Sequence, residues 1–380
     1  MTQAKTRLCF LIRQLNEGGA QRQIVELVKG LDQPHHAVTV VSLYSGGRFS
    51  ADVAHLPHVS YFSLAKHGRW DVVPFLYRLV CKMRCLRPDV IHGYLPAANV
   101  LCITLKPFLP RMRTVWGIRA SVMDWAQYDW LDRLLFQLQR VLARFVDLII
   151  INSNAGRDYH VARGFPASKI VVIPNGIDTH VFVPNGEERQ RVRTQWGITD
   201  KEKLIGFVAR LDPMKDHSTF LHAAALLTRS HAELRFVCVG DGPPSYRDQL
   251  LELTKRLQLA DRIIWERWRT DMPAIYNALD IATLCSYYGE GFPNVIGEAM
   301  ACGVPCVATE VGDSAYIVGD TGVIVRSRDP EALAKAWQLM LRRRGAEGPQ
   351  LGERARCRIT REFDREKLAK RTLDALEKVL

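Results

Sequence analysis

Short apolar segments alternate with segments of helical periodicity along nearly the whole chain, and this alternation limits the possible folds more than any other feature. The apolar segments span residues 7–15, 37–43, 89–92, 148–151, 204–209, 234–239, 262–265, 281–285 and 305–309. The clearest helical patterns lie at 70–86, 131–145, 217–229, 244–258, 271–278, 294–302 and 330–343. Strands that alternate with helices form parallel sheets through right-handed crossovers. We therefore predict an α/β chain built on doubly wound parallel sheets.

The alternating segments fall into two series, and a length of 380 residues suits two domains. Turns rich in Pro, Asn and Gly at 173–176 and 184–186, followed by a charged stretch at 187–193, separate the two series. The predicted division is a first domain at 1–178, a connection at 179–202 and a second domain at 203–361. Residues 362–380 read as a terminal helix, which we expect to pack back on the first domain.

The chain is strongly basic, with 52 Lys and Arg against 40 Asp and Glu and a formal net charge of +12. Such an excess favours nucleotides, diphosphates, nucleic acid or an acidic membrane face as partners. No zinc-finger, RNP or helix-turn-helix pattern supports nucleic acid. The sequence contains no run of eighteen apolar residues, and its nine cysteines form no CxxC pair. We expect a cytoplasmic chain with isolated thiols that meets a membrane, if at all, only from its surface.

The loop after the segment at 204–209 places two cations next to a helix N-terminus. Arg210 follows the predicted strand directly, and Lys215 stands just before the predicted helix. Arg offers a planar fork for phosphate oxygens, Lys offers a point charge, and the helix end adds unpaired N–H groups. The loop therefore fits a diphosphate, while an exposed turn with ordinary surface cations fits the same residues.

A second loop carries a carboxylate between two glycines and leads into the helical pattern at 294–302. At Glu290 the flanking glycines let the main chain approach a ligand closely. Glu298 follows about one turn into the helix. Two carboxylates suit sugar hydroxyls, because an ionised carboxylate accepts hydrogen bonds from adjacent hydroxyl groups. Solvated carboxylates in a turn and on a helix are the alternative.

Two weaker signals stand in the first half of the chain. Gly18 and Gly19 form a turn between the first strand and the first helix, and their amides fit an anion as well as they fit a plain tight turn. His92 ends the segment at 89–92, where a functional or a purely structural histidine is expected.

Taken together, these segments resemble a known family. In the block 290–309 two glutamates separated by seven residues precede Ala-Met-Ala-Cys-Gly-x-Pro, and motifs at 210–217, 173–178 and 18–19 accompany this block. In this combination the chain resembles the group-one, family-four retaining glycosyltransferases over nearly its whole length. The resemblance implies the GT-B fold, in which two Rossmann-like doubly wound domains face each other across a cleft.

The resemblance also implies roles for individual residues. Arg210 and Lys215 match diphosphate-binding positions, and Glu298 matches the residue that holds the nucleotide ribose. Glu290 and the loop through Asn294 match the part that contacts the donor sugar. The implied catalytic residues are Arg210, Lys215 and Glu290. The implied donor-binding residues are Gly18, Gly19, Gly291, Phe292, Pro293, Asn294 and Glu298.

The function implied by the resemblance is transfer of a sugar from a nucleoside-diphosphate donor, with a UDP-sugar favoured, to a lipid-linked or oligosaccharide acceptor. The implied setting is cell-surface polysaccharide biosynthesis, with the acceptor on the first domain and the donor on the second. The chain has no Asp-x-Asp pair to hold a donor-bridging metal. We therefore expect no metal and no cofactor, with Arg210 and Lys215 in the place of the metal and with retained anomeric configuration. The alternative is a saccharide-binding or scaffold protein that has kept the fold and lost turnover.

The chain departs from the family pattern in the first domain. Many relatives carry a histidine in the loop after the fourth or fifth strand, where this chain has Trp-Gly-Ile-Arg-Ala-Ser at 116–121. Arg119 is the candidate there, either for contact with the donor or for a pair with Asp124. His92 and Arg119 are thus the acceptor-side candidates.

Cationic and aromatic side chains gather in the first half, which suits anionic headgroups or a lipid diphosphate. Solvated helix faces and core tryptophans are the alternative. The residues are His67, Arg69, Trp70, Arg78, Lys82, Arg84, Arg87, Arg111, Arg113, Trp116, Trp125 and Trp130.

Overall fold

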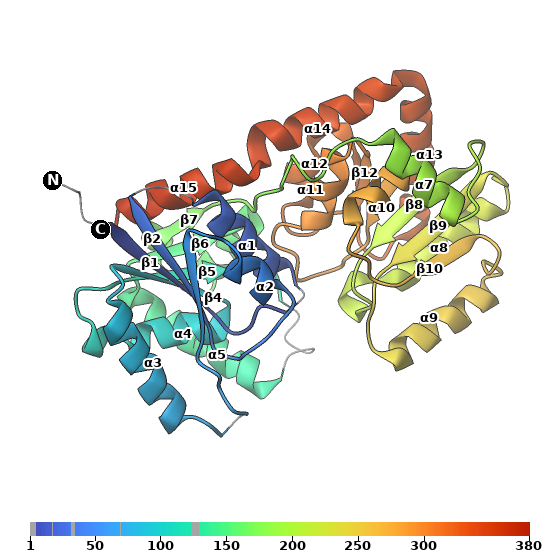
Figure 1. The fold of residues 1–380 in the computed structure, drawn as a ribbon. Coiled ribbons are helices and arrows are strands. Elements are labelled where there is room, and N and C mark those ends of the chain that lie inside the picture. The colour runs from blue at the N-terminus through green and yellow to red at the C-terminus, as the bar shows by residue number, and fades with distance from the viewer. Residues whose placement is uncertain (1–4, 17, 32–34, 69, 120, 124–128) are drawn as a thin grey trace. The chain divides into compact units, whose positions relative to one another are not determined.

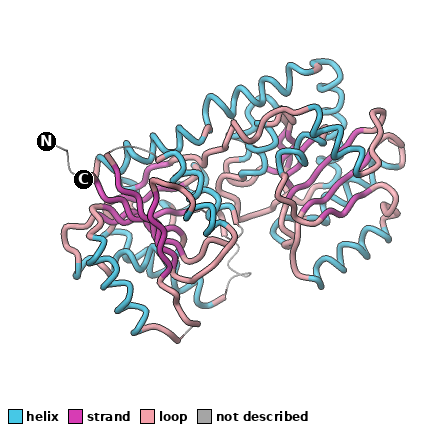
Figure 2. The backbone as a smooth tube through the Cα atoms, viewed as in Figure 1, coloured by secondary structure: helices cyan, strands magenta, loops and turns pink. Residues whose placement is uncertain are grey.

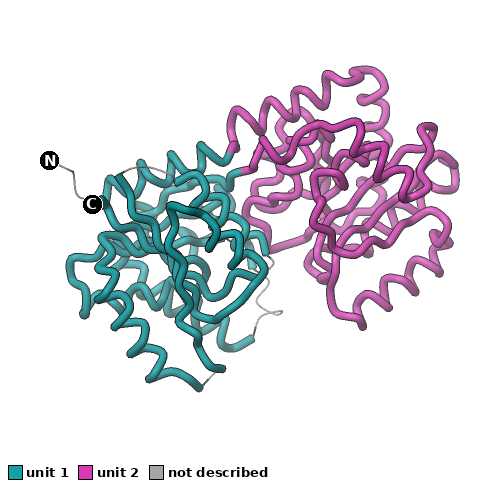
Figure 3. Tube along the Cα trace, in the orientation of Figure 1, with its two compact units in different colours: residues 1–176, 365–380 teal, residues 177–364 magenta. Residues whose placement is uncertain are grey.

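The computed structural model describes residues 5–16, 18–31, 35–68, 70–119, 121–123 and 129–380. The chain forms two compact units (Figure 3). Unit 1 comprises residues 1–176 and 365–380, and unit 2 comprises residues 177–364. Each unit is a parallel sheet with helices on both faces (Figures 1 and 2).

In its described residues, unit 1 has a seven-stranded parallel sheet with the order β3-β2-β1-β4-β5-β6-β7. The strands are β1 (Thr6–Ile12), β2 (His36–Ser42), β3 (Val59–Ser63), β4 (Val90–Tyr94), β5 (Arg113–Ile118), β6 (Leu148–Ile151) and β7 (Ile170–Val172). The helices are α1 (Gly19–Gly30), α2 (Phe49–Ala54), α3 (Val73–Leu86), α4 (Pro96–Thr104), α5 (Trp130–Leu142), α6 (Asn154–Val161) and α15 (Arg365–Glu377). One core cluster joins α1 and α15 to the sheet, and a second joins α3, α4, α5 and α6 to it. Two helical layers therefore cover the two faces of this sheet.

Unit 2 has a six-stranded parallel sheet with the order β10-β9-β8-β11-β12-β13. The strands are β8 (Lys203–Val208), β9 (Leu234–Val239), β10 (Ile263–Glu266), β11 (Ile281–Leu284), β12 (Cys306–Thr309) and β13 (Val323–Val325). The helices are α7 (Gly186–Gln195), α8 (His217–Thr228), α9 (Pro244–Arg256), α10 (Met272–Ala278), α11 (Asn294–Ala301), α12 (Ser314–Val318), α13 (Pro330–Glu347) and α14 (Pro349–Phe363). Residues of α8, α9 and α13 form one core cluster, and residues of α7, α10 and α11 form another.

The α/β class and the parallel sheets predicted from the sequence are confirmed. Most strands begin and end within two residues of the predicted segments, because buried parallel strands are continuous apolar runs. The short strands β3, β7 and β13, together with β5 and the helices α2, α4, α6, α7, α12 and α14, were not predicted. β3 and β7 lie at the edges of their sheet and are only partly buried; β3 has no continuous apolar run, and β7 is only three residues long.

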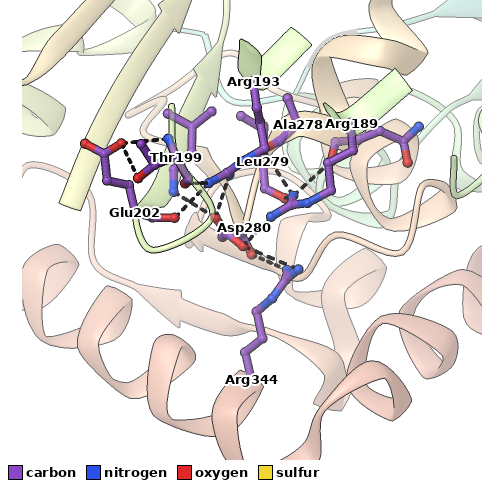
Figure 4. A network of polar contacts seen from close by, with 10 residues as sticks. Arg189, Arg193, Thr199, Glu202, Ala278, Leu279, Asp280 and Arg344 are labelled. Atoms are coloured by element: carbon purple, nitrogen blue, oxygen red, sulfur yellow. Dashed lines mark hydrogen bonds and ion pairs between the residues drawn. The ribbon is translucent and has the colours of Figure 1, made fainter. Parts of the chain in front are cut away.

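Residues 179–202, predicted as a connection, belong to unit 2. Their helix α7 packs against α10, and its Val192 is fully buried in the core. Arg189 and Arg193 donate to opposite oxygens of the buried Asp280 carboxylate, at 2.9 and 3.2 Å (Figure 4). In the sequence these arginines belong to the charged stretch of the predicted connection, but in the fold they anchor α7 to the strand that follows Asp280.

Arg344, in the last turns of α13, also binds Asp280. Arg344 donates to the main-chain oxygen of Asp280 at 2.6 Å, and its guanidinium lies 3.5 Å from the Asp280 carboxylate. The Leu204 N–H donates to the same carboxylate at 2.8 Å. Although burial pushes the pKa of Asp280 upward, the nearby charges of Arg189, Arg344 and Arg193 and the Leu204 bond outweigh it and lower the pKa.

Candidate functional site

In unit 2 the predicted site loops leave the sheet at its topological switch point. β8 pairs with β9 on one side and with β11 on the other, so the strand order reverses between β8 and β11. Doubly wound sheets bind ligands at the carboxyl ends of the strands that flank such a point. β8 leads to Arg210 and Lys215, and β11 leads to Glu290. The fold thus joins two loops that lie far apart in the sequence.

Two aspartates shape the loop after β8. Asp212 accepts from the Met214 N–H at 3.0 Å and starts a short 3-10 turn. Asp216 has a left-handed backbone with φ of 53° and accepts from the Thr219 N–H at 3.1 Å, which caps α8. Lys215 stands between the two caps, which fix the point where its side chain leaves the main chain.

Lys215 reaches the loop that follows β11. Its ammonium forms an ion pair with Glu290, and the Lys215 side chain is only 18% exposed. The same Glu290 oxygen accepts from Ser286 Oγ at 2.7 Å. The Ser286 carbonyl in turn accepts from Thr309 Oγ1 at the end of β12, at 2.6 Å. Charge-assisted bonds are strong where water is partly excluded, so this chain of contacts holds Glu290 in one orientation.

The main chains of the two loops are also in close contact. The Tyr287 N–H donates to the Met214 carbonyl at 3.2 Å. Gly312, with φ of 59°, packs so closely on this loop that a Cβ there would lie 2.4 Å from the Glu290 carbonyl oxygen. A larger residue at 312 would displace the loop that carries Glu290.

Glu298 lies in α11 and is 4% exposed. Tyr276, on the adjacent helix α10, donates its hydroxyl to Glu298 Oε2 at 2.8 Å. The predicted donor-binding residues Gly291, Phe292 and Pro293 are buried and lead into α11, which begins at Asn294. The tyrosine therefore orients the carboxylate that the sequence assigned to ribose binding.

Arg210 is placed differently from Lys215. Its side chain is 68% exposed and donates to Asp212 Oδ2 at 2.6 Å. An exposed pair of this kind contributes little stability, so its guanidinium can exchange the aspartate for another anion at small cost. The structure thus joins Lys215 to Glu290, and places Arg210 on the same loop with an aspartate as its partner.

In unit 1 the first predicted loop also follows a strand at the switch point, since β1 pairs with both β2 and β4. Gly18 and Gly19 are exposed, and α1 begins at Gly19. Gly18 is extended, with φ of 167°, and, as a glycine, it offers no side chain to cap the helix. The amides at the start of α1 therefore lie beside the turn predicted for an anion.

His92 lies inside unit 1 and does not reach the surface, with 1% of its area exposed. Its ring stands 5.5 Å from that of Phe10 and 4.7 Å from that of Tyr94. Neither ring nitrogen has a hydrogen-bond partner within the described part of the chain. Burial, reinforced by the positive charge of Arg119, holds the pKa of His92 well below its usual value. The imidazole is accordingly neutral at pH 7.

Arg119 follows β5 and is held by two neutral oxygens. Its guanidinium donates to Tyr94 Oη at 2.8 Å and to Asn175 Oδ1 at 2.9 Å. It also lies 4.7 Å from the centre of the Tyr94 ring. Asp124, the predicted alternative partner, lies outside the described residues, as do Arg69 and Trp125.

The residues that orient the predicted ones carry no sequence motif and were not predicted. Ser286 and Thr309 hold Glu290, Tyr276 holds Glu298, and Tyr94 and Asn175 hold Arg119. Hydroxyl and amide side chains carry no periodic signal. Apart from Tyr276, which lies on α10, only their position at or shortly after strand ends could have indicated them.

Two models of known protein families match this chain. Residues 17–181 match the model of Glycosyltransferase Family 4, and residues 202–343 match that of Glycosyl transferases group 1. The chain belongs to the group 1, family 4 glycosyltransferases. The family predicted from the sequence motifs is thereby confirmed.

Curated relatives of this glycosyltransferase family align over part of their length. A putative glycosyltransferase EpsF of Bacillus subtilis is 28% identical over 66% of this chain and 62% of that protein. A D-inositol 3-phosphate glycosyltransferase of Mycolicibacterium gilvum is 33% identical over 80% of this chain and 64% of that protein. The chain therefore spans less than two thirds of the length of these relatives.

Solved structures show the fold of this family member. HepE of Anabaena in complex with UDP has a TM-score of 0.84 and 21% identity, covering 98% of this chain and 100% of that chain. Sucrose-phosphate synthase of Thermosynechococcus elongatus has a TM-score of 0.84 and 20% identity, covering 98% and 99%. With its two parallel-sheet units, the chain has the predicted GT-B fold. None of the helices in the described residues has the length and apolar character needed to cross a bilayer.

Proposed function

We propose that this protein is a hexosyltransferase-type glycosyltransferase that moves a sugar from a nucleoside diphosphate, preferably UDP, to a lipid-linked or oligosaccharide acceptor. The observation that carries the proposal is the ion pair of Lys215 with Glu290, which unites the two loops at the switch point of unit 2. Solved relatives of the same fold bind UDP and UDP-glucose. The curated relatives are named glycosyltransferases.

Each proposed role follows from the chemistry of the side chain. Lys215 and Arg210 stabilise the negative charge that grows on the departing diphosphate, and this lowers the barrier more than it lowers the ground state. Glu298 accepts hydrogen bonds from the ribose hydroxyls, and Glu290 with the segment 291–294 contacts the donor sugar. In unit 1 the amides of Gly18 and Gly19 contact a phosphate or the acceptor.

We propose that transfer retains the anomeric configuration and needs neither metal nor cofactor. The sugar passes through an oxocarbenium-like transition state, and a leaving phosphate oxygen takes the proton of the acceptor hydroxyl. Fixed cations supply the stabilisation that a donor-bridging metal supplies elsewhere. NMR of the product anomer tests retention. Loss of turnover in EDTA that is restored by Mg²⁺ or Mn²⁺ would contradict metal independence.

The proposed acceptor side is unit 1, where His92 and Arg119 are the candidates. A neutral, buried His92 acts on substrate only through Tyr94 and Arg119, whereas Arg119 offers charge for an anionic group. The proposed setting is cell-surface polysaccharide biosynthesis, such as lipopolysaccharide or exopolysaccharide assembly. The protein would then work at the cytoplasmic face of the inner membrane, where a lipid-linked acceptor is accessible.

A thermal-shift screen with UDP-, GDP- and ADP-sugars tests the proposal first, because a bound donor stabilises the folded state by mass action. We expect the melting temperature to rise with one of them, and the UDP-sugar is favoured. Donor hydrolysis or transfer that is absent in Lys215→Ala, with folding intact, separates an enzyme from a saccharide-binding protein. No shift with any donor at millimolar concentration would overturn the proposal.

A further inference from the structure

The helix α5 of unit 1 presents an apolar face to solvent. Five large apolar side chains recur along it and the 3-10 turn that follows, and each is between 38% and 70% exposed. We call them the α5 stripe: Trp130, Leu134, Leu138, Val141 and Phe145. Their spacing of three or four residues places them on one face of the helix.

The opposite face of α5 is the one that packs on the sheet. Phe136 and Gln139 are its buried residues, and Phe136 belongs to the core cluster shared with α3 and α4. A surface helix normally turns its widest apolar face inward and its polar face outward. In α5 the exposed side carries more large apolar residues than the buried side, which marks an interaction surface rather than ordinary packing.

The charges beside the α5 stripe indicate the kind of partner that covers it. Arg133, Arg140 and Arg144 are exposed on the same segment, and no acidic residue occurs between 133 and 146. Residues 70–147 hold eleven Lys and Arg against six Asp and Glu, a net +5 of the chain's +12, even with Asp71 and Asp147 counted as the ion-pair partners of Arg78, Lys106 and Arg113. The helices of this segment, α3, α4 and α5, pack against one face of the sheet (Figure 1). A partner for this layer must therefore be apolar and negatively charged.

A neighbouring part of the same layer has the same character. Trp70 is 89% exposed, and Val73 and Tyr77 are 77% and 72% exposed at the start of α3. Arg84 of α3 lies 5.7 Å from the ring centre of Phe108, which is itself exposed. Apolar side chains surrounded by arginines and tryptophans suit the boundary between headgroups and acyl chains, where cationic ends reach anionic phosphates.

We propose that the α5 stripe docks on the surface of an anionic lipid bilayer, with Trp130, Leu134 and Leu138 entering the interface and the arginines binding phosphates. This docking rests on the proposed function, because it would bring the protein to a lipid-linked acceptor. A second copy of the chain fits the stripe less well, because an isologous contact would bring like charges together.

Flotation of the full-length protein with vesicles tests the docking. We expect binding to phosphatidylcholine vesicles that contain about one third phosphatidylglycerol, and weak binding to phosphatidylcholine alone, because each Arg near an anionic surface contributes about 1 kcal/mol. Leu134→Gln with Leu138→Gln should reduce partitioning about tenfold or more, since two apolar side chains leave the interface. Arg133→Gln with Arg140→Gln should reduce partitioning onto the anionic vesicles about fivefold for each charge removed. Salt at 0.5 M should also reduce this partitioning.

A matched control uses exposed leucines of unit 2. Leu226 and Leu339 are 43% and 45% exposed, so Leu226→Gln with Leu339→Gln changes surface polarity equally and should leave vesicle binding unchanged. We call Leu134→Gln with Leu138→Gln the α5 variant. Equal vesicle binding by the α5 variant and the control, or no binding of the unaltered protein to anionic vesicles, overturns the proposal. A dimer in sedimentation that dissociates in the α5 variant, without vesicle binding, assigns the stripe to a second copy and also overturns it.

The rise in melting temperature with the donor tests the proposed function independently of vesicle docking. The α5 variant should show the same melting-temperature rise with the UDP-sugar as the unaltered protein, because α5 is not part of the proposed donor site. Vesicle binding without any donor shift contradicts the proposed function only. A donor shift without vesicle binding contradicts the docking only.

Discussion

The Lys215 ammonium forms an ion pair with the Glu290 carboxylate, 75 residues later in the chain and on a different strand-end loop. This pair neutralises a largely buried cation. It also places the cation beside the loop proposed to hold the donor sugar. We therefore expect the proposed site to be sensitive to replacement of Lys215.

Replacing Lys215 by Ala should reduce kcat of sugar transfer by about 100- to 1000-fold, because a preorganised charge at a developing anion contributes at this level. Arg210→Ala should act in the same direction. The matched control is Arg267→Ala, which removes another exposed arginine that pairs with an aspartate in unit 2. Initial rates with the UDP-sugar measure the effect. Wild-type rates in Lys215→Ala would contradict the proposed role.

Ser286→Ala should lower kcat about tenfold, because it removes a hydrogen bond to the charged Glu290. Ser286 is a positioning residue, so the affinity for UDP should stay unchanged in calorimetry while kcat falls. Ser218→Ala, at a half-buried serine of the same unit that does not contact Glu290, is the control. A rise in the dissociation constant of UDP with unchanged kcat would assign Ser286 to another role.

Tyr276→Phe should weaken UDP binding about tenfold, because Glu298 loses the hydroxyl that orients it for the ribose. Calorimetric titration with UDP measures the change. Tyr316→Phe, an exposed tyrosine of the same unit, should bind UDP normally. Unchanged affinity in Tyr276→Phe would show that Glu298 does not depend on this contact or does not hold the ribose.

Asp280→Asn should lower the free energy of unfolding by about 3–5 kcal/mol, since it leaves Arg189, Arg193 and Arg344 without their shared counterion. Urea denaturation measures the loss, and Asp261→Asn at an exposed position is the control. The pKa of Asp280 is lowered in the folded state, so its contribution is complete above the ordinary aspartate pKa. It disappears as the pH falls through the lowered value. A loss no larger than that of the control would contradict this.

The free energy of unfolding should also decrease as the pH is lowered, because His217 is buried. Burial, followed by the charge of Lys215, lowers the pKa of His217 to about 3. Below the unfolded value of about 6.5 the unfolded chain binds a proton that the folded chain refuses. The free energy of unfolding should therefore decrease by up to about 1.4 kcal/mol per pH unit as the pH falls from 6.5 toward 3.

His217→Phe should flatten this part of the pH profile, because a phenyl ring fits among Phe207, Tyr246 and Trp265 and takes up no proton. His222→Phe on the exposed side of α8 is the control and should keep the slope. Denaturant melts at several pH values provide the comparison. A slope in His217→Phe equal to that of the unaltered protein would locate the titration elsewhere, such as His160, whose pKa burial lowers to about 4.

The sequence by itself determined the alternation of strands and helices, the two parallel sheets, the family and the loops that carry Arg210, Lys215, Glu290 and Glu298. These properties are local, because apolar periodicity and glycine or proline punctuation depend only on neighbouring residues. Tertiary structure alone decided that Lys215 pairs with Glu290, that Ser286 and Tyr276 orient the two glutamates, and that α7 belongs to unit 2. Such contacts join residues far apart in the chain, and an arginine or serine has the same local signature whether it faces solvent or a buried carboxylate.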